Sequence, residues 1–291
     1  MNMQKIKYVF FGTPSFAVTI LEELEKMGLI PSLIVTQPDA PYGRGKNITP
    51  PPVKVWAQDR KIEFLQPEKI DEAFLEKIKK NEWDLFIVAA YGKLLPQALL
   101  DIPEHGTLNV HPSLLPRLRG PSPIRSAILQ DEKETGVSIM LLDDKMDHGP
   151  LVAQEKIEIP EWPPDAMWLE NSLAHAGGSL LSRTIPDWIA GNIEAREQNH
   201  EQTTYCSKLL KKDAEINLSG DAYENLLKIR GYGGDIGAYT FFERADKKIR
   251  VEIIDASLNQ SGELKINSVK PEGKNEMSYE DFLRSGAHPI T

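Results

Sequence analysis

Strand-like and helix-like segments alternate through the first half of this chain, and this alternation constrains the fold more than any other feature of the sequence. Short apolar runs predict strands, and the stretches between them carry the apolar spacing of helices. Strands separated by helices indicate βαβ units, so we expect an α/β fold with a mainly parallel sheet. The predicted strands span residues 7–11, 33–35, 85–90, 107–110, 137–142 and 151–159, and the predicted helices span 16–27, 53–61, 71–80 and 166–189.

Two of these helices carry signals of their own. Ser15 is a candidate N-cap for the helix over residues 16–27, and Gly28 can end it. The helix over residues 166–189 is expected to break near Gly177-Gly178 and again at Pro186, because both residue types disfavour a helix interior.

The pattern changes after the polar stretch of residues 191–203, which we interpret as a linker. Beyond it, short predicted strands at 238–242, 249–254 and 263–269 alternate with turns, a pattern typical of a small β-barrel. A length of 291 residues fits two domains at about 150 residues each. We therefore expect a Rossmann-like domain over residues 1–190 and an OB-like β-barrel over residues 204–291.

Charge and cysteine content exclude several classes of protein. The formal net charge of −9 argues against a general nucleic-acid or membrane coat, although a local basic patch can still serve one specific nucleic acid. Cys206 is the single cysteine, which excludes a disulfide framework within the chain and points to a reducing compartment. The sequence has no signal-peptide pattern and no apolar run near the roughly 20 residues of a membrane span. We expect a cytoplasmic protein without membrane contact.

Motifs for common cofactors are incomplete. The first predicted strand–helix turn, Gly12-Thr13-Pro14-Ser15, lacks the three-glycine spacing of a dinucleotide site. The segment Gly43-Arg44-Gly45-Lys46-Asn47 lacks the upstream glycine and the Ser or Thr of a phosphate loop. None of the six histidines forms a His-Glu-x-x-His pair. NAD, ATP and a helical zinc site are therefore poorly supported.

A polar pair, Asn109 and His111, ends the predicted strand over residues 107–110. Strand side chains alternate, so both point to one face, at the carboxyl end where open α/β sheets place ligands. An amide can donate to an oxyanion, and an imidazole can move a proton near neutral pH. Together they suit a reaction that builds an oxyanion while an amine loses a proton. A histidine bonded at a strand end beside a turn asparagine remains the alternative.

Three acids follow in the loop between the strands predicted at 137–142 and 151–159. A carboxylate from Asp143, Asp144 or Asp147 can return to the same sheet edge and orient His111. Taken alone, each of these acids is more typical of a turn residue. The loop over residues 112–120 contains two prolines and is therefore stiff, which suits ligand binding.

The ordered combination of residues 108–120, Thr135-Gly136-Val137 and residues 146–149 resembles the folate-dependent formyltransferases. That family uses 10-formyltetrahydrofolate as a co-substrate to formylate an amine. The resemblance implies no metal. It assigns catalysis to Asn109, His111 and Asp147, and folate binding to Ser113, Leu114, Leu115 and Pro116.

Further segments resemble the branch of that family that formylates methionyl initiator tRNA. The long loop over residues 37–52 is understood to insert into the acceptor stem, and residues 205–217 and 277–283 resemble the start and the last strand region of a tRNA-binding barrel. The chain departs from that branch at Leu218 and over residues 231–237. The resemblance implies tRNA contacts from Arg44, Lys46, Lys208, Lys211 and Lys212.

Other functions remain open at this point. The three lysines also fit a solvated helix face, and the long loop also fits a surface insertion. The acceptor could be a small amine, such as a ribonucleotide or an amino sugar-nucleotide. The same three residues could also cleave formyltetrahydrofolate with water, or a non-catalytic protein could bind folate or RNA. We expect a monomer that acts on methionyl initiator tRNA.

Overall fold

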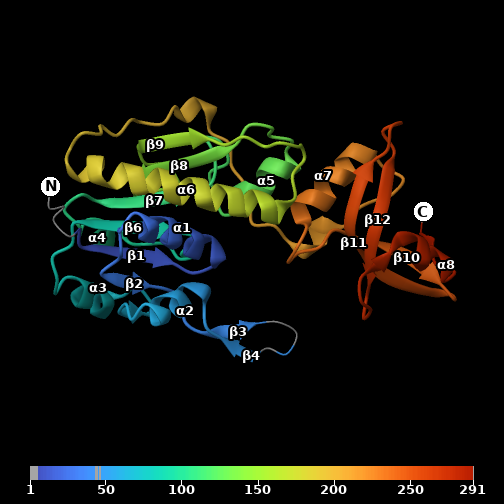
Figure 1. The fold of residues 1–291 in the computed structure, drawn as a ribbon, viewed down its shortest axis with the longest axis horizontal. Helices are drawn as coiled ribbons and strands as arrows, with labels where there is room; N and C mark the ends of the chain where they lie inside the picture. The colour runs from blue at the N-terminus through green and yellow to red at the C-terminus, as the bar shows by residue number, and fades with distance from the viewer. Residues whose placement is uncertain (1–5, 43–44, 46, 291) are drawn as a thin grey trace. The chain divides into compact units, whose positions relative to one another are not determined.

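The computed structural model describes residues 6–42, 45 and 47–290. The chain divides into two compact units, each built from several stretches (Figure 1). Unit 1 comprises Met1–Gly120, Thr135–Ile157 and Glu170–Tyr205, and unit 2 comprises Pro121–Glu134, Glu158–Leu169 and Cys206–Thr291. The sequence-based division at residues 190 and 204 stays a prediction about where the functional domains begin and end.

Unit 1 is built around a seven-stranded sheet, which confirms the expected α/β fold. Five neighbouring strands are parallel, and the last two, β8 and β9, run antiparallel to their neighbours. The order across the sheet is β5 (Phe64–Leu65), β2 (Leu33–Val35), β1 (Tyr8–Gly12), β6 (Leu85–Ala89), β7 (Thr107–His111), β8 (Gly136–Leu141) and β9 (Leu151–Lys156).

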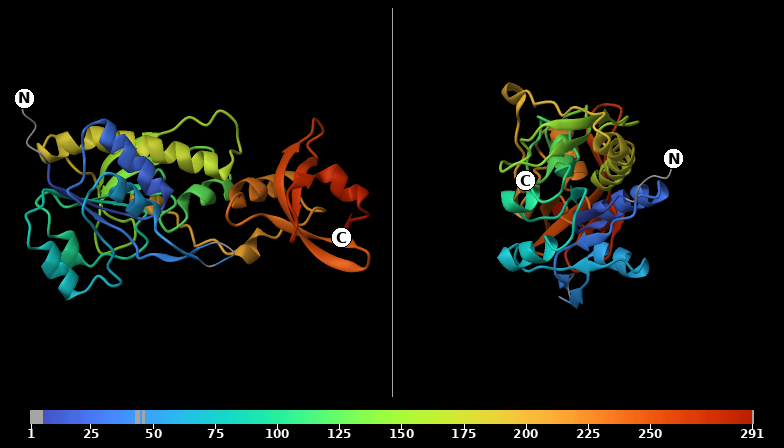
Figure 2. Two further views of the ribbon diagram at one scale, coloured as in Figure 1. Left: turned by 60° about the horizontal axis from the view of Figure 1, so that its bottom comes forward. Right: turned by 90° about the vertical axis from the view of Figure 1, so that its left-hand side faces the viewer.

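Helices cover both faces of this sheet, which explains why its central strands are continuous apolar runs. Val9 and Phe11 of β1 pack in one core cluster with Phe74 of helix α3 (Glu72–Ile78). On the other face, α1 (Ser15–Lys26) lies beside α6 (Ala166–Ile189) (Figure 2). The helices α2 (Pro52–Asp59) and α4 (Gln97–Leu100) complete unit 1.

Two helix predictions are corrected. Ser15 is the first residue of α1 and not its cap; Pro14 is the N-cap and makes no side-chain bond. The helix α6 is continuous and does not break at Gly177-Gly178 or Pro186. A Cβ on Gly177 would lie 2.8 Å from Val110, and one on Gly178 would lie 2.6 Å from Glu23 of α1. The glycines therefore allow close packing, which outweighs their poor helix propensity.

The long loop over residues 37–52 folds back on itself. Its arms, β3 (Ala40–Tyr42) and β4 (Asn47–Thr49), pair as antiparallel strands. The side chain of Ile48 is 66% exposed. Arg44 and Lys46 lie outside the described residues.

Unit 2 contains a five-stranded antiparallel sheet, in agreement with the predicted β-rich C-terminal region. Phe242 packs against Phe282 in its core, with 5.0 Å between the ring centroids. The order is β13 (Met277–Ser278), β12 (Leu264–Pro271), β11 (Lys247–Leu258), β10 (Tyr239–Arg244) and β14 (His288–Pro289).

The helices of unit 2 were not all predicted. Residues 277–283 resemble a last strand region, yet only two of them are in β13, and the rest belong to α8 (Tyr279–Arg284). Ser278 caps this helix by accepting from the Asp281 N–H. Likewise Asp221 caps α7 (Ala222–Tyr232), which occupies part of the glycine-rich stretch. The helix α5 (Pro123–Leu129) also belongs to unit 2.

Candidate active site

The strand β7 brings Asn109 and His111 to the carboxyl edge of the sheet in unit 1, between β6 and β8. Asn109 lies opposite Met140 of β8, and His111 lies opposite Ser138. Both side chains are almost enclosed, at 9% and 4% exposure. Within the described part of the chain, the Asn109 amide has no hydrogen-bond partner. It is therefore available to a ligand.

His111 is held by a hydrogen bond at one ring nitrogen and lies beside a carboxylate at the other. Its Nε2 lies 3.1 Å from the carbonyl oxygen of Leu118. A carbonyl can only accept, so Nε2 carries a proton. The Nδ1 atom then faces Asp147 Oδ1 at 3.6 Å, and Asp147 Oδ2 accepts from the Gly120 N–H at 2.7 Å. The backbone of residues 118–120 thus positions both the imidazole and its carboxylate.

The three acids of the loop before β9 have different surroundings in the structure. Asp147 is the one beside His111. Asp143 instead pairs with His148, at 2.7 Å from Oδ2 to Nδ1, and Asp144 is exposed. Of the three candidates, Asp147 alone is placed to orient the imidazole.

The segment expected to bind folate is anchored to β8 and β9. The hydroxyl of Ser138 accepts from the Leu115 N–H at 3.1 Å and donates to the carbonyl oxygen of Ser113 at 2.7 Å. Gln154 Nε2 donates to the Leu115 carbonyl oxygen at 2.9 Å. Proline content alone suggested this stiffness, and the two anchoring residues were missed. A serine inside the apolar run of β8 is the signal that could have found one of them.

Gly136 leaves no room for a side chain beside this segment. A Cβ there would lie 2.7 Å from Leu114 and 2.8 Å from the Lys156 Cα, and would overlap the Glu155 carbonyl oxygen. If residues 113–116 bind the folate donor, as the family resemblance implies, we expect Gly136→Ala to raise the KM for that donor by about tenfold, because overpacking of ~1–3 kcal/mol must displace Leu114 or β9. The measurement is steady-state kinetics with the donor varied.

Gly178→Ala is the matched control for that prediction. It also crowds a neighbour, Glu23 of α1, but its contacts lie in the helix pair and not in residues 113–116. It should change stability and leave the donor KM unaltered. An unchanged donor KM in a folded Gly136→Ala variant would remove Leu114 from the folate site.

The loop after β6 completes this edge of the sheet. Thr13 Oγ1 and Gln37 Nε2 both donate to the Tyr91 carbonyl oxygen at 3.0 Å. Gln37 therefore ties the segment before the β3–β4 hairpin to the loop after β6. Burial raises the pKa of Tyr91 to about 12, so its phenol stays neutral at physiological pH.

Two buried polar residues beside Asp147 were also missed. Arg119 belongs to the motif of residues 108–120, but the sequence assigns it no role. Gln198 lies in the predicted linker over residues 191–203. Both are less than 5% exposed, and they hydrogen-bond to each other. A glutamine in a polar stretch carries no local signal that it will be buried. Residues 191–203 as a whole group with unit 1.

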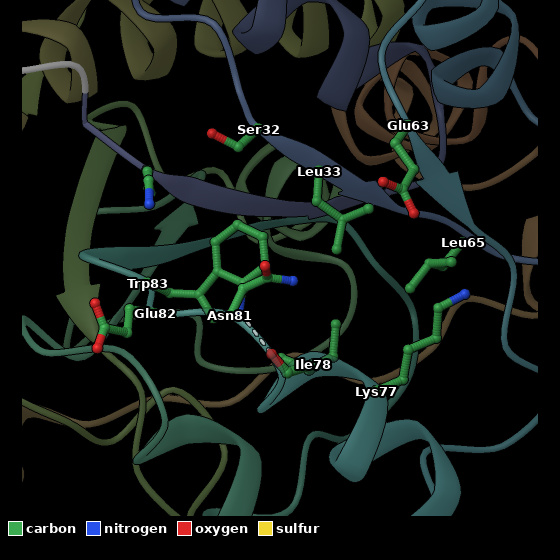
Figure 3. A pocket seen from close by; sticks show the side chains of 10 residues that line it. Ser32, Leu33, Glu63, Leu65, Lys77, Ile78, Asn81, Glu82 and Trp83 are labelled. Carbon is green, nitrogen blue, oxygen red and sulfur yellow. Dashed lines mark hydrogen bonds between the residues drawn. The ribbon is translucent and has the colours of Figure 1, made fainter.

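A cavity of about 320 Å³ lies elsewhere in unit 1, at the opposite edge of the sheet (Figure 3). Its lining residues lie around the starts of β1, β2, β5 and β6 and at the end of α3. They include Leu33, Glu63 and Trp83, whose indole N–H donates to the Ile78 carbonyl oxygen. None of the candidate site residues lines it.

The predicted tRNA-contacting lysines are exposed on unit 2. Lys211 and Lys212 begin a single 3₁₀ turn over Lys211–Ala214, and Lys208 precedes it. The run is therefore not a face of a long helix.

Among the described residues, no cluster of three or more His, Cys, Asp or Glu could hold a metal ion. No helix in that same part of the chain is long and apolar enough to cross a membrane.

Comparisons with known proteins agree with this architecture. The model of the formyl transferase family matches residues 4–185, and the chain belongs to that family. It is 38% identical to a methionyl-tRNA formyltransferase of Halalkalibacterium halodurans, over 98% of this chain and 96% of that protein. It is also 38% identical to the protein of that name from Bacillus subtilis, over 97% and 95%.

Two solved structures share the fold. A methionyl-tRNA formyltransferase from Clostridium thermocellum superimposes with a TM-score of 0.59 at 15% identity, covering 90% of this chain and 98% of that one. A 4-N formyltransferase from Francisella tularensis gives 0.65 at 18% identity, covering 88% and 100%. The fold is thus shared with two formyltransferases that carry different names.

Proposed function

We propose that this protein transfers the formyl group of 10-formyltetrahydrofolate to the α-amino group of methionyl initiator tRNA, which yields N-formylmethionyl-tRNA for translation initiation. The observation that carries the proposal is the near full-length identity of 38% to proteins named methionyl-tRNA formyltransferase. The geometry around Asn109, His111 and Asp147 supports it, because it suits acyl transfer to an amine.

The reaction begins when the neutral amine attacks the formyl carbon. A free α-amino group has a pKa of about 7.7–8.0, so an appreciable fraction is neutral at cellular pH. A new C–N bond forms and the carbonyl oxygen becomes an oxyanion, to which the Asn109 amide donates. The bond from that carbon to the folate nitrogen then breaks. The amine loses one proton and the folate nitrogen gains one, with His111 and Asp147 helping its movement.

Residues 204–291 are proposed as the tRNA-binding part, together with the β3–β4 hairpin. The exposed lysines at 208, 211 and 212 would contact phosphates, as would Arg44 and Lys46, which lie outside the described residues. Two short basic patches on an acidic protein favour one docking pose over indiscriminate binding. We infer a cytoplasmic monomer with no membrane or metal partner.

An acceptor comparison tests the proposal. The protein is supplied with 10-formyltetrahydrofolate and, in parallel, with methionyl initiator tRNA, an amino sugar-nucleotide, or neither. We expect formylated methionyl-tRNA in the first reaction and little turnover in the others. Preference for the small amine would establish the small-amine alternative, and formate without an acceptor would establish the hydrolase.

Replacing Lys208, Lys211 and Lys212 together with alanine tests the tRNA surface. We expect a higher KM for charged tRNA and a salt dependence of log(kcat/KM) that is shallower by about 0.7–0.9 for each phosphate that the variant no longer neutralises. The affinity for the folate donor should not change. The measurement is kcat/KM against salt concentration for both proteins, and superimposable curves would mean that these lysines do not touch tRNA.

A matched control distinguishes the effect of losing three positive charges from the effect of where those charges lie. Lys77, Lys79 and Lys80 stand at the end of α3 in unit 1, outside every proposed contact. Their triple replacement removes the same charge. It should leave both the KM for charged tRNA and the salt slope close to those of the unaltered protein.

A further inference from the structure

Asp147 stands in a turn that its own backbone does not favour. Its φ of +49° is the left-handed conformation, which costs free energy for a residue that carries a side chain. Contacts from outside the turn must therefore hold it. Gly120 bonds to the carboxylate, while Gln198 Nε2 donates to the Asp147 carbonyl oxygen at 3.0 Å and to the Gly149 carbonyl oxygen at 2.7 Å.

The other end of the Gln198 amide is bound to Arg119. Its Oε1 accepts from Arg119 Nε at 3.1 Å and from Nη2 at 2.6 Å. These four bonds fix the amide, with oxygen toward the guanidinium and nitrogen toward the turn. Among the described residues, no carboxylate lies within ion-pair distance of the buried Arg119. The cation therefore polarises the amide and strengthens its N–H groups as donors.

A second chain of contacts leads from Arg119 to the same turn. Its Nη2 lies 2.9 Å from Nδ1 of His200, which must accept because a guanidinium only donates. The His200 ring stacks on His148 with centroids 4.3 Å apart and planes 7° apart. His148 lies between Asp147 and Gly149 in the sequence, and it pairs with Asp143. The turn is thus supported at its carbonyl groups and at its histidine.

We propose that Gln198, polarised by Arg119, is a positioning residue that holds the Asp147 turn and so keeps the carboxylate beside His111. It touches neither substrate nor the reacting atoms, and it acts through Asp147. This inference rests on the proposed function only in its kinetic test, which measures formyl transfer. The contacts themselves can be followed without any substrate.

Two substitutions separate the donor role of Gln198 from its bulk. Gln198→Met keeps the length of the side chain and removes all four bonds. Gln198→Glu keeps the shape and an acceptor for Arg119, but it cannot donate to the two carbonyl oxygens. If the donor role matters, both variants lose function. If packing or the Arg119 contact is what matters, Gln198→Glu behaves like the unaltered protein.

Tyr8→Phe is the matched control. The Tyr8 hydroxyl is buried and donates to a backbone carbonyl, that of Leu29, at 2.8 Å. It lies at the amino end of β1, away from the carboxyl edge of the sheet. This variant therefore loses a buried side-chain-to-backbone bond of the same kind, outside the site.

Two readouts are taken from every variant, the kinetic constants and the exchange rate of the Gly120 amide hydrogen. We expect both Gln198 variants to lose about 10–100-fold in kcat, with each KM within about twofold, because misplacement of a catalytic group lowers turnover more than binding. We also expect the Gly120 amide to exchange about tenfold faster as its bond to Asp147 loosens. Tyr8→Phe should change neither readout.

Loss of kcat together with faster Gly120 exchange, in both variants, supports the proposal. Normal kcat or normal exchange in Gln198→Glu overturns it. Should the unaltered protein fail to formylate methionyl-tRNA, the proposed function falls. The exchange rate alone then decides whether Gln198 holds the turn.

Discussion

Replacing Asn109 with alanine is expected to lower kcat by about 10²–10³-fold, the usual loss when one oxyanion donor is removed. The amide is nearly enclosed at the carboxyl edge and, within the described part of the chain, it has no protein partner to lose. Stability and folate affinity should therefore change little. The measurement is kcat under saturating donor and charged tRNA, with the KM for each.

Asn192→Ala is the control for this substitution. Asn192 is exposed, and its amide bonds only weakly to Asp187, at 3.3 Å. Turnover should stay normal there. Near-normal turnover in a folded Asn109→Ala variant would instead exclude that amide from oxyanion stabilisation.

His111→Ala and Asp147→Ala are each expected to remove about 10²–10⁴-fold of kcat, the range for a general acid or base. The double variant should lose little more than the worse single variant, because the two groups act as a unit. The physical reason is their shared support: one carboxylate oxygen faces the ring, and the loop that binds the ring also binds the other oxygen. Single-turnover rates of the unaltered protein, the two single variants and the double variant complete the double-mutant cycle.

His175 and Glu23 provide a matched pair. They form another histidine–carboxylate contact, 2.7 Å long, between α6 and α1 and away from the site. Their single and double replacements should leave turnover intact. If the losses at His111 and Asp147 multiply in full, the two residues contribute independently and the assigned roles are wrong.

The sequence predicted the sheet, and it singled out two of the candidate site residues for a definite physical reason. A fully buried strand is apolar, so the polar Asn109 and His111 at one end of such a run stand out, and alternation puts them on one face. Asp147 needed more. The residues alone left three acids of one loop open, and the family resemblance selected Asp147. The fold places that carboxylate beside His111, whereas Asp143 pairs with His148.

What the sequence could not predict depends on packing between distant residues. Gln198 lies 51 positions from Asp147, in a polar stretch that resembles a linker, and nothing local marks it as buried. From the sequence, Gly177 and Gly178 predict a break in the helix. Their actual role is to leave space for Val110 and Glu23, and this depends on tertiary packing that the sequence does not show. In unit 2, the region that resembled a last strand is a strand only at Met277–Ser278, and the helix α8 follows it, capped by Ser278.

The central claim is that formyl transfer to methionyl-tRNA takes place at Asn109, His111 and Asp147. The most direct measurement is a single-turnover reaction with 10-formyltetrahydrofolate that is labelled in the formyl group, followed by location of the label. We predict that the label moves to the α-amino nitrogen of methionyl initiator tRNA, and that Asn109→Ala slows this movement. Label released as formate, or equally rapid transfer by the Asn109→Ala variant, would contradict the account.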